Sequence, residues 1–217
     1  MDEPTPVSIV ILGDSGCGKS MFLARLSIGQ DGCATRIQAS PGDARQEPAA
    51  PSAVAPALPV LRDLDQPFTY NVRLYQKHYK LEFYDTAYPH ENWTLLRPDL
   101  VILAFDITSR EGLGRLKKWR HDITRHYQSP RYAASAAGEK IPILMLGLKR
   151  DLRVENDSTI YPQESYRIAQ ELRCDRYAEC SALTGELIPE VFEDIARLAA
   201  RSTTEAGGQT EGGCVVM

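Results

Sequence analysis

Near the amino terminus, two glycines, a lysine and a serine follow the spacing G-x-x-x-x-G-K-S. The segment with this spacing reads Gly13, Asp14, Ser15, Gly16, Cys17, Gly18, Lys19 and Ser20. Glycines let successive backbone N–H groups turn inward, and such a nest at a helix N-terminus binds anions. Lys19 can place a mobile positive charge between β- and γ-phosphates, and the Ser20 hydroxyl is a hard oxygen suited to Mg²⁺. The pattern therefore predicts a loop that binds the phosphates of a nucleotide.

The residues on either side of this loop supply the setting that the pattern requires. An apolar, β-branched run at residues 7–12 precedes it, and residues 21–26 have the composition of a helix. An ordinary turn between a strand and a helix is the alternative interpretation. However, four fixed positions match by chance in only about one chain in a hundred of this size. The order of strand, loop and helix favours the phosphate-binding interpretation further.

The composition limits which classes of protein are possible. The 217 residues suffice for one domain with a full core. The net charge of -4 gives no indication of nucleic-acid binding. The acidic start predicts no signal peptide, and no apolar run approaches the length of a membrane span. Five cysteines without metal-ligand spacing favour free thiols in a reducing compartment. We therefore expect a cytoplasmic monomer, unless a further group attaches it to a membrane.

Strand and helix patterns alternate along the rest of the chain. After residue 30, the predicted elements are an antiparallel hairpin at 68–75 and 79–84, strands at 100–105, 141–146 and 177–180, and helices around 113–127, 162–172 and 191–199. Continuous apolar strands are typical of a parallel sheet that is covered on both faces. The alternation predicts an α/β fold, a doubly wound mixed sheet of about six strands flanked by helices. Ligands bind such sheets at the carboxyl ends of the strands.

A Pro- and Ala-rich stretch at about 31–62 interrupts this pattern. It has little to bury, so we expect it to be disordered or extended. A long insertion in a surface loop adds little loop-closure entropy, so the fold can carry it. The predicted organisation is one domain at residues 1–200 that carries the phosphate-binding loop and contains this insertion, followed by a flexible tail at 201–217.

Three further motifs resemble those of the Ras-like small GTPases, and among them the Rho type. In order, they are Asp85-Thr86-Ala87, Leu148-Lys149-Arg150-Asp151 and Cys180-Ser181-Ala182-Leu183. The resemblance runs from Val7 to about Ala200, with the insertion between. It implies a domain that binds GTP and GDP with Mg²⁺ and acts as a signalling switch. It also implies effector proteins, exchange factors and GTPase-activating proteins as partners.

The resemblance assigns roles to residues of these motifs. It implies that Asp85 holds a water on Mg²⁺, which Ser20 binds directly. A carboxylate at Asp151 can accept hydrogen bonds from N1–H and N2–H₂ of guanine, a pair that adenine does not offer. The backbone N–H of Ala182 would meet guanine O6. The predicted guanine-binding residues are Leu148, Lys149, Asp151, Ser181, Ala182 and Leu183.

The chain departs from the family at the positions that serve hydrolysis. Ser15 stands where hydrolysing members usually have Gly, and its side chain crowds the γ-phosphate and the space for an arginine finger. Where the family continues with Gly-Gln-Glu, this chain reads Tyr88-Pro89-His90-Glu91. Pro89 can neither donate an N–H nor orient a water. An arginine finger contributes ~10⁵-fold in Ras, a relative, so obstructing it predicts slow or impaired hydrolysis.

The sequence offers candidate replacements for two side chains that the family uses, the water-orienting Gln and the switch threonine. His90 could position the attacking water, which makes it the candidate catalytic residue, or it could be an ordinary exposed loop histidine. Asp63 stands near the position of the family's switch threonine, and Thr69 is the only hydroxyl close by.

In the guanine motifs, Leu148 replaces an Asn and Leu183 a Lys. A lost hydrogen bond of this kind costs about 0.5–1.5 kcal/mol, which weakens binding without abolishing it.

The chain ends in Cys214-Val215-Val216-Met217, a C-a-a-X box in which Met favours farnesylation of Cys214. Stable anchoring needs two signals, and the preceding tail contains Glu205 and Glu211 but no lysine run. We therefore expect reversible residence at the cytoplasmic face of membranes, the plasma membrane first, and a partner that shields the prenyl group.

Three hypotheses of function remain open. The first is a membrane-associated Rho-like switch with slow GTP hydrolysis. The second is a normally cycling GTPase in which His90 or another group replaces the missing Gln. The third is a scaffold that has kept the fold and lost the nucleotide. An ATP-using kinase is disfavoured because Asp151 and the Ser181-Ala182 pair fit guanine.

Overall fold

The computed structural model describes residues 3–28, 58–62, 65–74, 77–85, 96–127, 141–154 and 159–205 of the chain. Within these residues, six strands form one sheet in the order β2-β3-β1-β4-β5-β6. The strands are β1 (Thr5–Leu12), β2 (Phe68–Leu74), β3 (Lys77–Asp85), β4 (Leu100–Asp106), β5 (Ile143–Leu148) and β6 (Arg176–Glu179). β2 pairs antiparallel with β3, and every other neighbouring pair is parallel. The predicted mixed sheet is confirmed.

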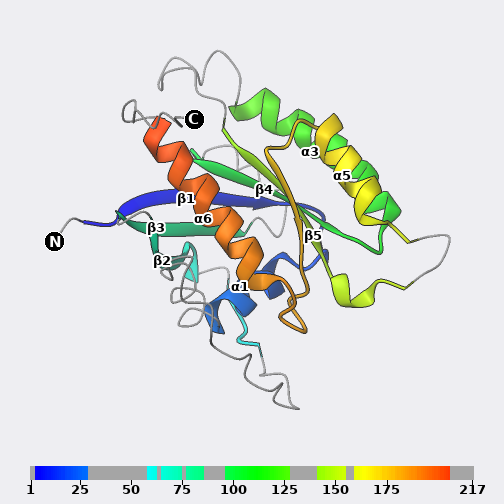
Figure 1. Ribbon diagram of the computed structural model, residues 1–217, viewed down its shortest axis with the longest axis horizontal. Coiled ribbons are helices and arrows are strands. Elements are labelled where there is room, and N and C mark those ends of the chain that lie inside the picture. Colours follow the sequence, from blue (N-terminus) through cyan, green and yellow to red (C-terminus); the bar gives the residue numbers. More distant parts are fainter. Residues whose placement is uncertain are drawn as a thin grey trace, which may run out of the picture.

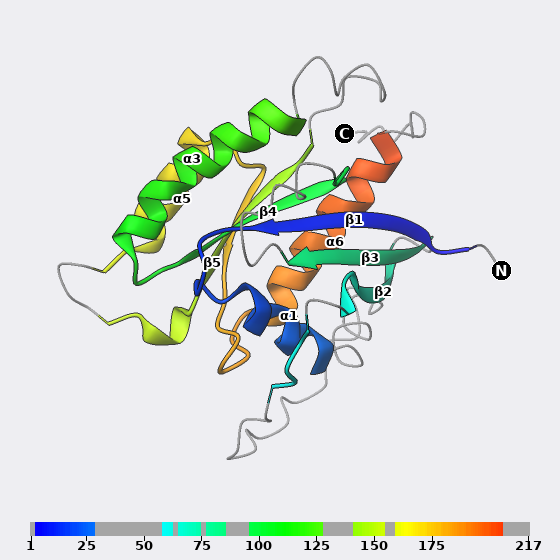
Figure 2. The ribbon, with the colours of Figure 1, turned by 180° about the vertical axis from the view of Figure 1, so that it is seen from behind.

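Helices cover both faces of the sheet (Figure 1). They are α1 (Lys19–Ile28), α3 (Arg110–Tyr127), α5 (Pro162–Glu171) and α6 (Ile188–Glu205), with a short 3-10 helix, η3 (Arg150–Leu152). α1 and α6 lie on one face, and α3 and α5 lie on the other, as the view from behind also shows (Figure 2). The sequence alternation of strands and helices thus produces a doubly wound fold.

Alternate residues of the central strands pack into two separate hydrophobic clusters, one on each face of the sheet. Ile9 and Ile11 of β1 join Phe22 and Leu23 of α1 in the cluster under α1 and α6. Val10, the residue between them, joins the cluster under α3 and α5. Since successive strand residues point to opposite faces, a strand buried on both sides must be apolar throughout. This explains the uninterrupted apolar runs that the sequence displays.

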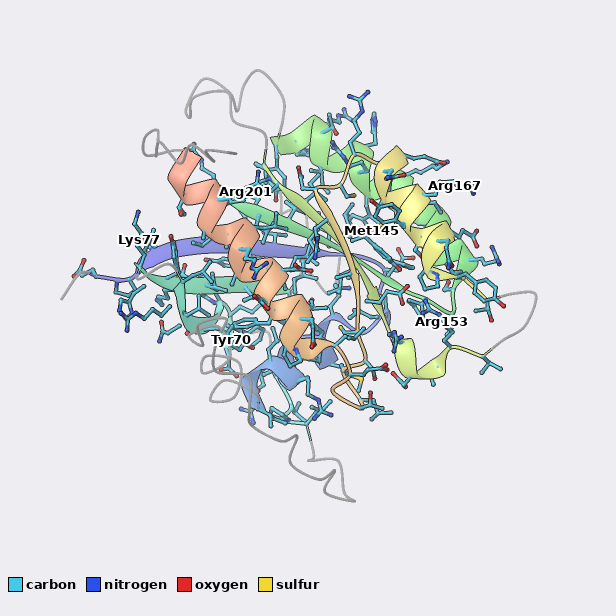
Figure 3. All side chains as sticks on the ribbon, viewed as in Figure 1. Tyr70, Lys77, Met145, Arg153, Arg167 and Arg201 are labelled. Carbon is cyan, nitrogen blue, oxygen red and sulfur yellow. The ribbon has the colours of Figure 1, made fainter. Side chains whose placement is uncertain are left out.

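Tyr70 of β2 fixes α1 against the sheet. Its hydroxyl donates a hydrogen bond to the carbonyl oxygen of Leu23 over 2.9 Å. Its ring makes edge-to-face contacts with Phe83 and Phe192, at centroid distances of 5.3 and 6.2 Å. Burial raises the pKa of Tyr70 to about 12, so the hydroxyl stays a donor at neutral pH. Figure 3 labels this residue where β2, α1 and α6 meet.

Some predicted boundaries were wrong. β3 begins at Lys77 rather than residue 79, because its ladder with β2 continues through the pairs Arg73–His78 and Leu74–Lys77. The strand predicted at 141–146 lies at Ile143–Leu148. Pro142 stays outside it because it has no N–H to donate, although its carbonyl accepts a hydrogen bond from Val101 N over 3.1 Å.

Two segments extend the ordered core beyond the predicted limits. α6 continues to Glu205, so the start of the predicted tail is helical. Leu61, in the last part of the predicted insertion, packs against the cluster under α1 and α6. The rest of the insertion, at 31–57, and the tail beyond Glu205 lie outside the described residues. None of the described helices has the length and apolar character to cross a membrane.

Candidate functional site

The candidate site is formed where the parallel strands end. The pairs of neighbouring residues nearest these ends are Ile11 with Asp85, Leu12 with Leu103, Asp106 with Leu148, and Gly147 with Glu179. The register therefore places the phosphate-loop motif, Asp85 and both guanine motifs along one edge. In an open α/β sheet this carboxyl edge is where ligands bind.

The loop between β1 and α1 depends on glycines at specific positions. The φ angles of Gly13, Gly16 and Gly18 are +156°, +76° and +111°, values that side chains disfavour. A Cβ added to Gly13 would lie 2.2 Å from the carbonyl oxygen of Ala104 on β4. The loop can therefore pass this close to β4 only because residue 13 is glycine.

Lys19, the first residue of α1, turns back over the loop. Only 4% of its surface is exposed. Its Nζ donates hydrogen bonds to the carbonyl oxygens of Gly13 and Asp14, both over 2.9 Å. These bonds hold the ammonium group beside the loop, where it can neutralise a bound phosphate. The structure thus places Lys19 as the sequence pattern predicts.

Ser20 and Asp85 bring two hard oxygen groups together at the start of α1. The Ser20 hydroxyl donates a hydrogen bond to Asp85 Oδ2 over 2.5 Å, and Asp85 is 8% exposed. A hydroxyl and a carboxylate suit Mg²⁺, which takes few protein ligands and completes its shell with phosphate oxygens and waters. Among the described residues, no group of three or more His, Cys, Asp or Glu could hold a metal without such help. The donor set therefore fits a magnesium ion that arrives with a nucleotide.

Gln66 is a polar neighbour of this pair that the sequence analysis missed. Its side-chain amide donates a hydrogen bond to the backbone carbonyl of Asp85 over 3.0 Å. Thr69, by contrast, is exposed and pairs with Glu82, three residues before Asp85 along β3. At about 3.3 Å per residue, this places Thr69 about 10 Å back along the strand direction from Asp85, on the neighbouring strand. The structure therefore does not bring Thr69 to the Ser20–Asp85 pair, and Asp63 lies outside the described residues.

Helix α3 contacts the phosphate loop through Asp14. The Asp14 carboxylate accepts hydrogen bonds from Arg115 Nη1 over 3.0 Å and from Trp119 Nε1 over 3.3 Å. Arg115 also pairs with Glu111 one turn earlier. Trp119 lies in the middle of α3, and its half-buried indole reaches the loop. Ser15, the next residue along, is exposed at the mouth of the loop.

Leu148 meets the phosphate loop through apolar contact. It is the last residue of β5, whereas the predicted strand ended at residue 146, and it is 1% exposed. A Cβ added to Gly18 would lie 3.6 Å from both Leu148 Cβ and Cδ1, an ordinary van der Waals distance. Where the resemblance leads us to expect an Asn that ties two loops by hydrogen bonds, this chain has a packed side chain.

Lys149 adopts a left-handed conformation, with φ of 63°, and turns its side chain along the edge of the sheet. Its Nζ bonds Asp106 Oδ2 at the end of β4 over 2.7 Å. Burial tends to raise the pKa of Asp106, but hydrogen bonds from Lys149 and Thr108 outweigh it, so the pKa is lowered. The Lys149–Asp106 ion pair thus keeps the lysine stem beside the phosphate loop.

Asp151, in η3, is oriented by the second guanine motif. The Ser181 hydroxyl donates a hydrogen bond to Asp151 Oδ1 over 2.5 Å and accepts one from Thr184 N over 3.1 Å. Ser181 is fully buried, whereas Asp151 is half-buried and open to a ligand. Ser181 therefore orients the Asp151 carboxylate. The Leu183 side chain is 52% exposed and points away from the core.

Arg25 of α1 holds the same segment from the other side, and no motif indicated it. Its Nε donates a hydrogen bond to the Ala182 carbonyl over 2.5 Å, and its Nη2 donates one to the Leu183 carbonyl. The contact joins residues 157 positions apart in the sequence. Arg25 belongs to none of the motifs, and nothing in the sequence around it indicates this contact, so only the fold reveals it.

A buried ion pair joins two residues that stand next to the guanine motifs in the sequence, Arg153 and Glu179. Arg153 donates to both carboxylate oxygens of Glu179 over 2.7 Å each, and Tyr177 donates to the same carboxylate. The side chains of Arg153 and Glu179 are 16% and 7% exposed. The Glu179 carboxylate raises the pKa of Arg153, which stays charged. Figure 3 shows Arg153 beside η3, which carries Asp151.

Two predicted site residues cannot be placed. The candidate catalytic residue His90 and the predicted lipidation site Cys214 both lie outside the described residues, as do Thr86 to Glu91. The phosphate-loop residues and the six predicted guanine-binding residues are all described, and they meet at one edge of the sheet.

Comparisons with known proteins agree with this geometry. A family model described as the Ras family matches residues 65–201. The GTP-binding protein RHO2 of Saccharomyces cerevisiae is 25% identical, and the alignment covers 96% of this chain and 95% of the relative. The GTP-binding protein rho2 of Schizosaccharomyces pombe is 23% identical, over 91% of this chain and 88% of the relative. The Ras-like GTP-binding protein RhoL of Drosophila melanogaster is 27% identical, over 64% and 72%.

Proposed function

The chain belongs to the Ras family, as a Rho-type small GTPase, and from this membership we propose that it binds GTP and GDP with Mg²⁺ and acts as a signalling switch with slow hydrolysis. One observation carries the proposal. The Ser20–Asp85 pair and the Ser181–Asp151 pair lie at the same edge of the sheet, one on each side of the loop that Lys19 covers. A nucleotide that spans this edge would meet a phosphate site and a base site together.

Each group at this edge has a chemical task in the proposed complex. The loop amides and Lys19 bind the phosphates, and Ser20 and Asp85 orient the metal. When bound, Mg²⁺ neutralises charge on the β- and γ-phosphate oxygens. Asp151 accepts from the N1–H and N2–H₂ groups of guanine, with its carboxylate aligned by Ser181. Adenine offers no such donor pair, so the base site selects guanine.

Slow hydrolysis is supported by the residues around the γ-phosphate position. Ser15 is exposed at the mouth of the loop, where an arginine finger would approach. Pro89 replaces the Gln that orients water in the family, and Pro has no N–H to contribute. With both aids impaired, we expect turnover at about the intrinsic rate of Ras, about 10⁻⁴ per second, or below it.

The test is single-turnover phosphate release from protein loaded with labelled GTP. The natural chain should release phosphate slowly, and the double change Tyr88→Gly with Pro89→Gln should accelerate release by restoring a Gly-Gln pair. His90→Ala should leave the slow rate unchanged. A fast natural rate that His90→Ala abolishes would instead establish the normally cycling alternative. No binding of GTP or GDP at all would favour the nucleotide-free scaffold.

We further propose that Cys214 is farnesylated and brings the protein reversibly to the cytoplasmic face of the plasma membrane. The C-a-a-X ending supports this, and Glu205 and Glu211 argue against a second, polybasic signal. Effectors, exchange factors, GTPase-activating proteins and a prenyl-shielding protein are the partners expected of such a switch. Cell fractionation of the natural chain and of Cys214→Ser tests the anchor. Equal membrane fractions for both would contradict it.

A further inference from the structure

Arg25 bonds the backbone of the second guanine motif from a helix that carries no guanine motif. The residue is 9% exposed on α1. Its hydrogen bonds reach two consecutive carbonyls, those of Ala182 and Leu183. A guanidinium group presents several N–H donors in a rigid plane, so two bonds fix both the distance and the tilt of the two peptide groups.

The segment that Arg25 holds is also fixed at its other end. The Ser181 hydroxyl bonds both Asp151 and the backbone N–H of Thr184. Ser181 N donates to the Glu186 carbonyl over 3.0 Å, and Gly185 N donates to the Ser181 carbonyl over 2.9 Å. Ala182 therefore lies between Ser181, which is anchored to Asp151, and the two peptide groups that Arg25 bonds.

Burial makes the Arg25 contact energetically important. Burying a charged or polar group is costly unless hydrogen bonds replace those that it made with water. The guanidinium group and the two carbonyls therefore each need the other as a partner. Hydrogen bonds that involve a charged group are shorter and stronger than neutral ones. The contact is thus strong enough to determine where the Ala182 backbone lies.

Arg25 also connects this segment to the phosphate site. It lies six residues after Lys19 on the same helix, about 9 Å further along the axis. α1 is held to the sheet through the Tyr70 hydroxyl and the Leu23 carbonyl. One rigid element therefore carries a phosphate-binding ammonium at its start and a backbone clamp for the base site in its second turn.

We infer that Arg25 is a positioning residue for purine selection, which holds the Ala182 N–H where it can donate to the 6-oxygen of the base. The inference rests on the proposed function. It divides base recognition into two parts. Asp151 accepts hydrogen bonds from the N1–H and N2–H₂ groups, and the Ala182 N–H, in the segment that Arg25 holds, donates one to the 6-oxygen.

Nucleotide analogues separate these two parts. GDP and inosine diphosphate both have the 6-oxygen, and they differ only in the 2-amino group that Asp151 reads. The diphosphate of 2-aminopurine riboside keeps the 2-amino group but lacks both the 6-oxygen and the N1–H, so it binds more weakly from the start and its affinity does not depend on the Ala182 N–H. Loss of the clamp should therefore weaken the first two ligands equally and spare the third. A general loss of folding would weaken all three.

The experiment measures dissociation constants of the three diphosphates with Mg²⁺ for the full chain and for Arg25→Met. We expect the Kd of GDP and of inosine diphosphate to rise by about tenfold, the equivalent of one hydrogen bond, while the Kd of the 2-aminopurine ligand stays within about twofold. Arg25→Lys keeps the charge but not the fork, and should give an intermediate rise with the same pattern. If Arg25→Met does not fold, Arg25→Lys supplies the comparison. Arg167→Met, on the outer surface of α5 with a side chain 72% exposed, is the matched control.

The outcomes are distinct. An equal loss for all three ligands, or no loss for any, would overturn the role of Arg25 while leaving GDP binding by the natural chain intact. If the natural chain itself does not bind GDP, the proposed function fails together with this inference. A rise confined to the two 6-oxo ligands would establish the role.

Discussion

The Ser20 hydroxyl donates a hydrogen bond to Asp85 Oδ2 across 2.5 Å, and so joins the start of α1 to the end of β3. The two residues are 65 positions apart and meet because β1 and β3 are parallel neighbours that end at the same edge. Both groups are hard oxygen donors, and Mg²⁺ accepts such donors along with phosphate oxygens. Their apposition is the structural basis of the proposed magnesium dependence.

Replacement of Ser20 by Ala should uncouple nucleotide binding from magnesium. The variant loses the hydroxyl that would bind the metal, so GDP should dissociate about tenfold faster or more in the presence of Mg²⁺. Addition of EDTA should then have little further effect. Dissociation of a fluorescent GDP measures both rates. Ser27→Ala is the control, because that hydroxyl bonds the Ala24 carbonyl within α1. A full EDTA response in Ser20→Ala would contradict the assignment.

Asp151→Asn should change base preference. The amide keeps one acceptor oxygen but replaces the other with a donor, so it can no longer accept from both N1–H and N2–H₂ of guanine. A hydrogen bond to a charged group is worth about 1.5–3 kcal/mol, so the Kd of GDP should rise by at least about tenfold. Xanthosine diphosphate, with an oxygen at position 2, should gain affinity. Competition binding of the two nucleotides checks both changes, and unchanged preference would remove Asp151 from the base site.

Arg153→Met should destabilise the domain by leaving the buried Glu179 carboxylate without its bidentate partner. Breaking one side of a buried ion pair costs about 3–5 kcal/mol. Urea unfolding should therefore give a markedly lower free energy of unfolding than for the natural chain. Arg197→Met breaks the exposed pair with Glu193 and should cost about 0.5 kcal/mol or less. Equal effects of the two substitutions would show that the Arg153–Glu179 pair is not structural.

Asp106→Asn should lower stability in a pH-dependent manner. The pKa of Asp106 in the folded chain lies below its ordinary value of 3.8, mainly because the Lys149 and Thr108 hydrogen bonds outweigh burial. Its stabilising effect is therefore complete above 3.8 and is lost as the pH falls through the folded pKa. At neutral pH the variant should lose about 1–2 kcal/mol of unfolding free energy. Urea titrations along a pH series test this. A difference from the natural chain that stays constant below 3.8 would contradict it.

Much of this architecture was predictable because it depends on local patterns. The apolar run at 7–12, the glycine spacing and the helix after it are all visible within twenty consecutive residues, and they fold as predicted. The apolar strands β4 and β5 were predictable because a strand covered on both faces leaves no polar positions. β5 begins two residues later than predicted because Pro142 has no N–H to donate to a neighbouring strand.

The supporting contacts were not predictable because they depend on distant partners. Arg25, Gln66 and Asp14 each bond groups that the sheet topology brings to them. A charged residue in a helix usually faces water, so the sequence gives no reason to place Arg25 under the guanine motif. Arg153 and Glu179 stand close to the two guanine motifs in the sequence, but only the structure reveals that they bond one another.

The most direct test of the central claim is a calorimetric titration of nucleotide-free protein with GDP and, separately, with ADP in Mg²⁺. The account predicts that GDP binds with a Kd below about 1 μM, that ADP gives no measurable binding, and that Lys19→Ala abolishes the GDP signal. Equal affinities for GDP and ADP, or a GDP signal that Lys19→Ala leaves unchanged, would contradict it.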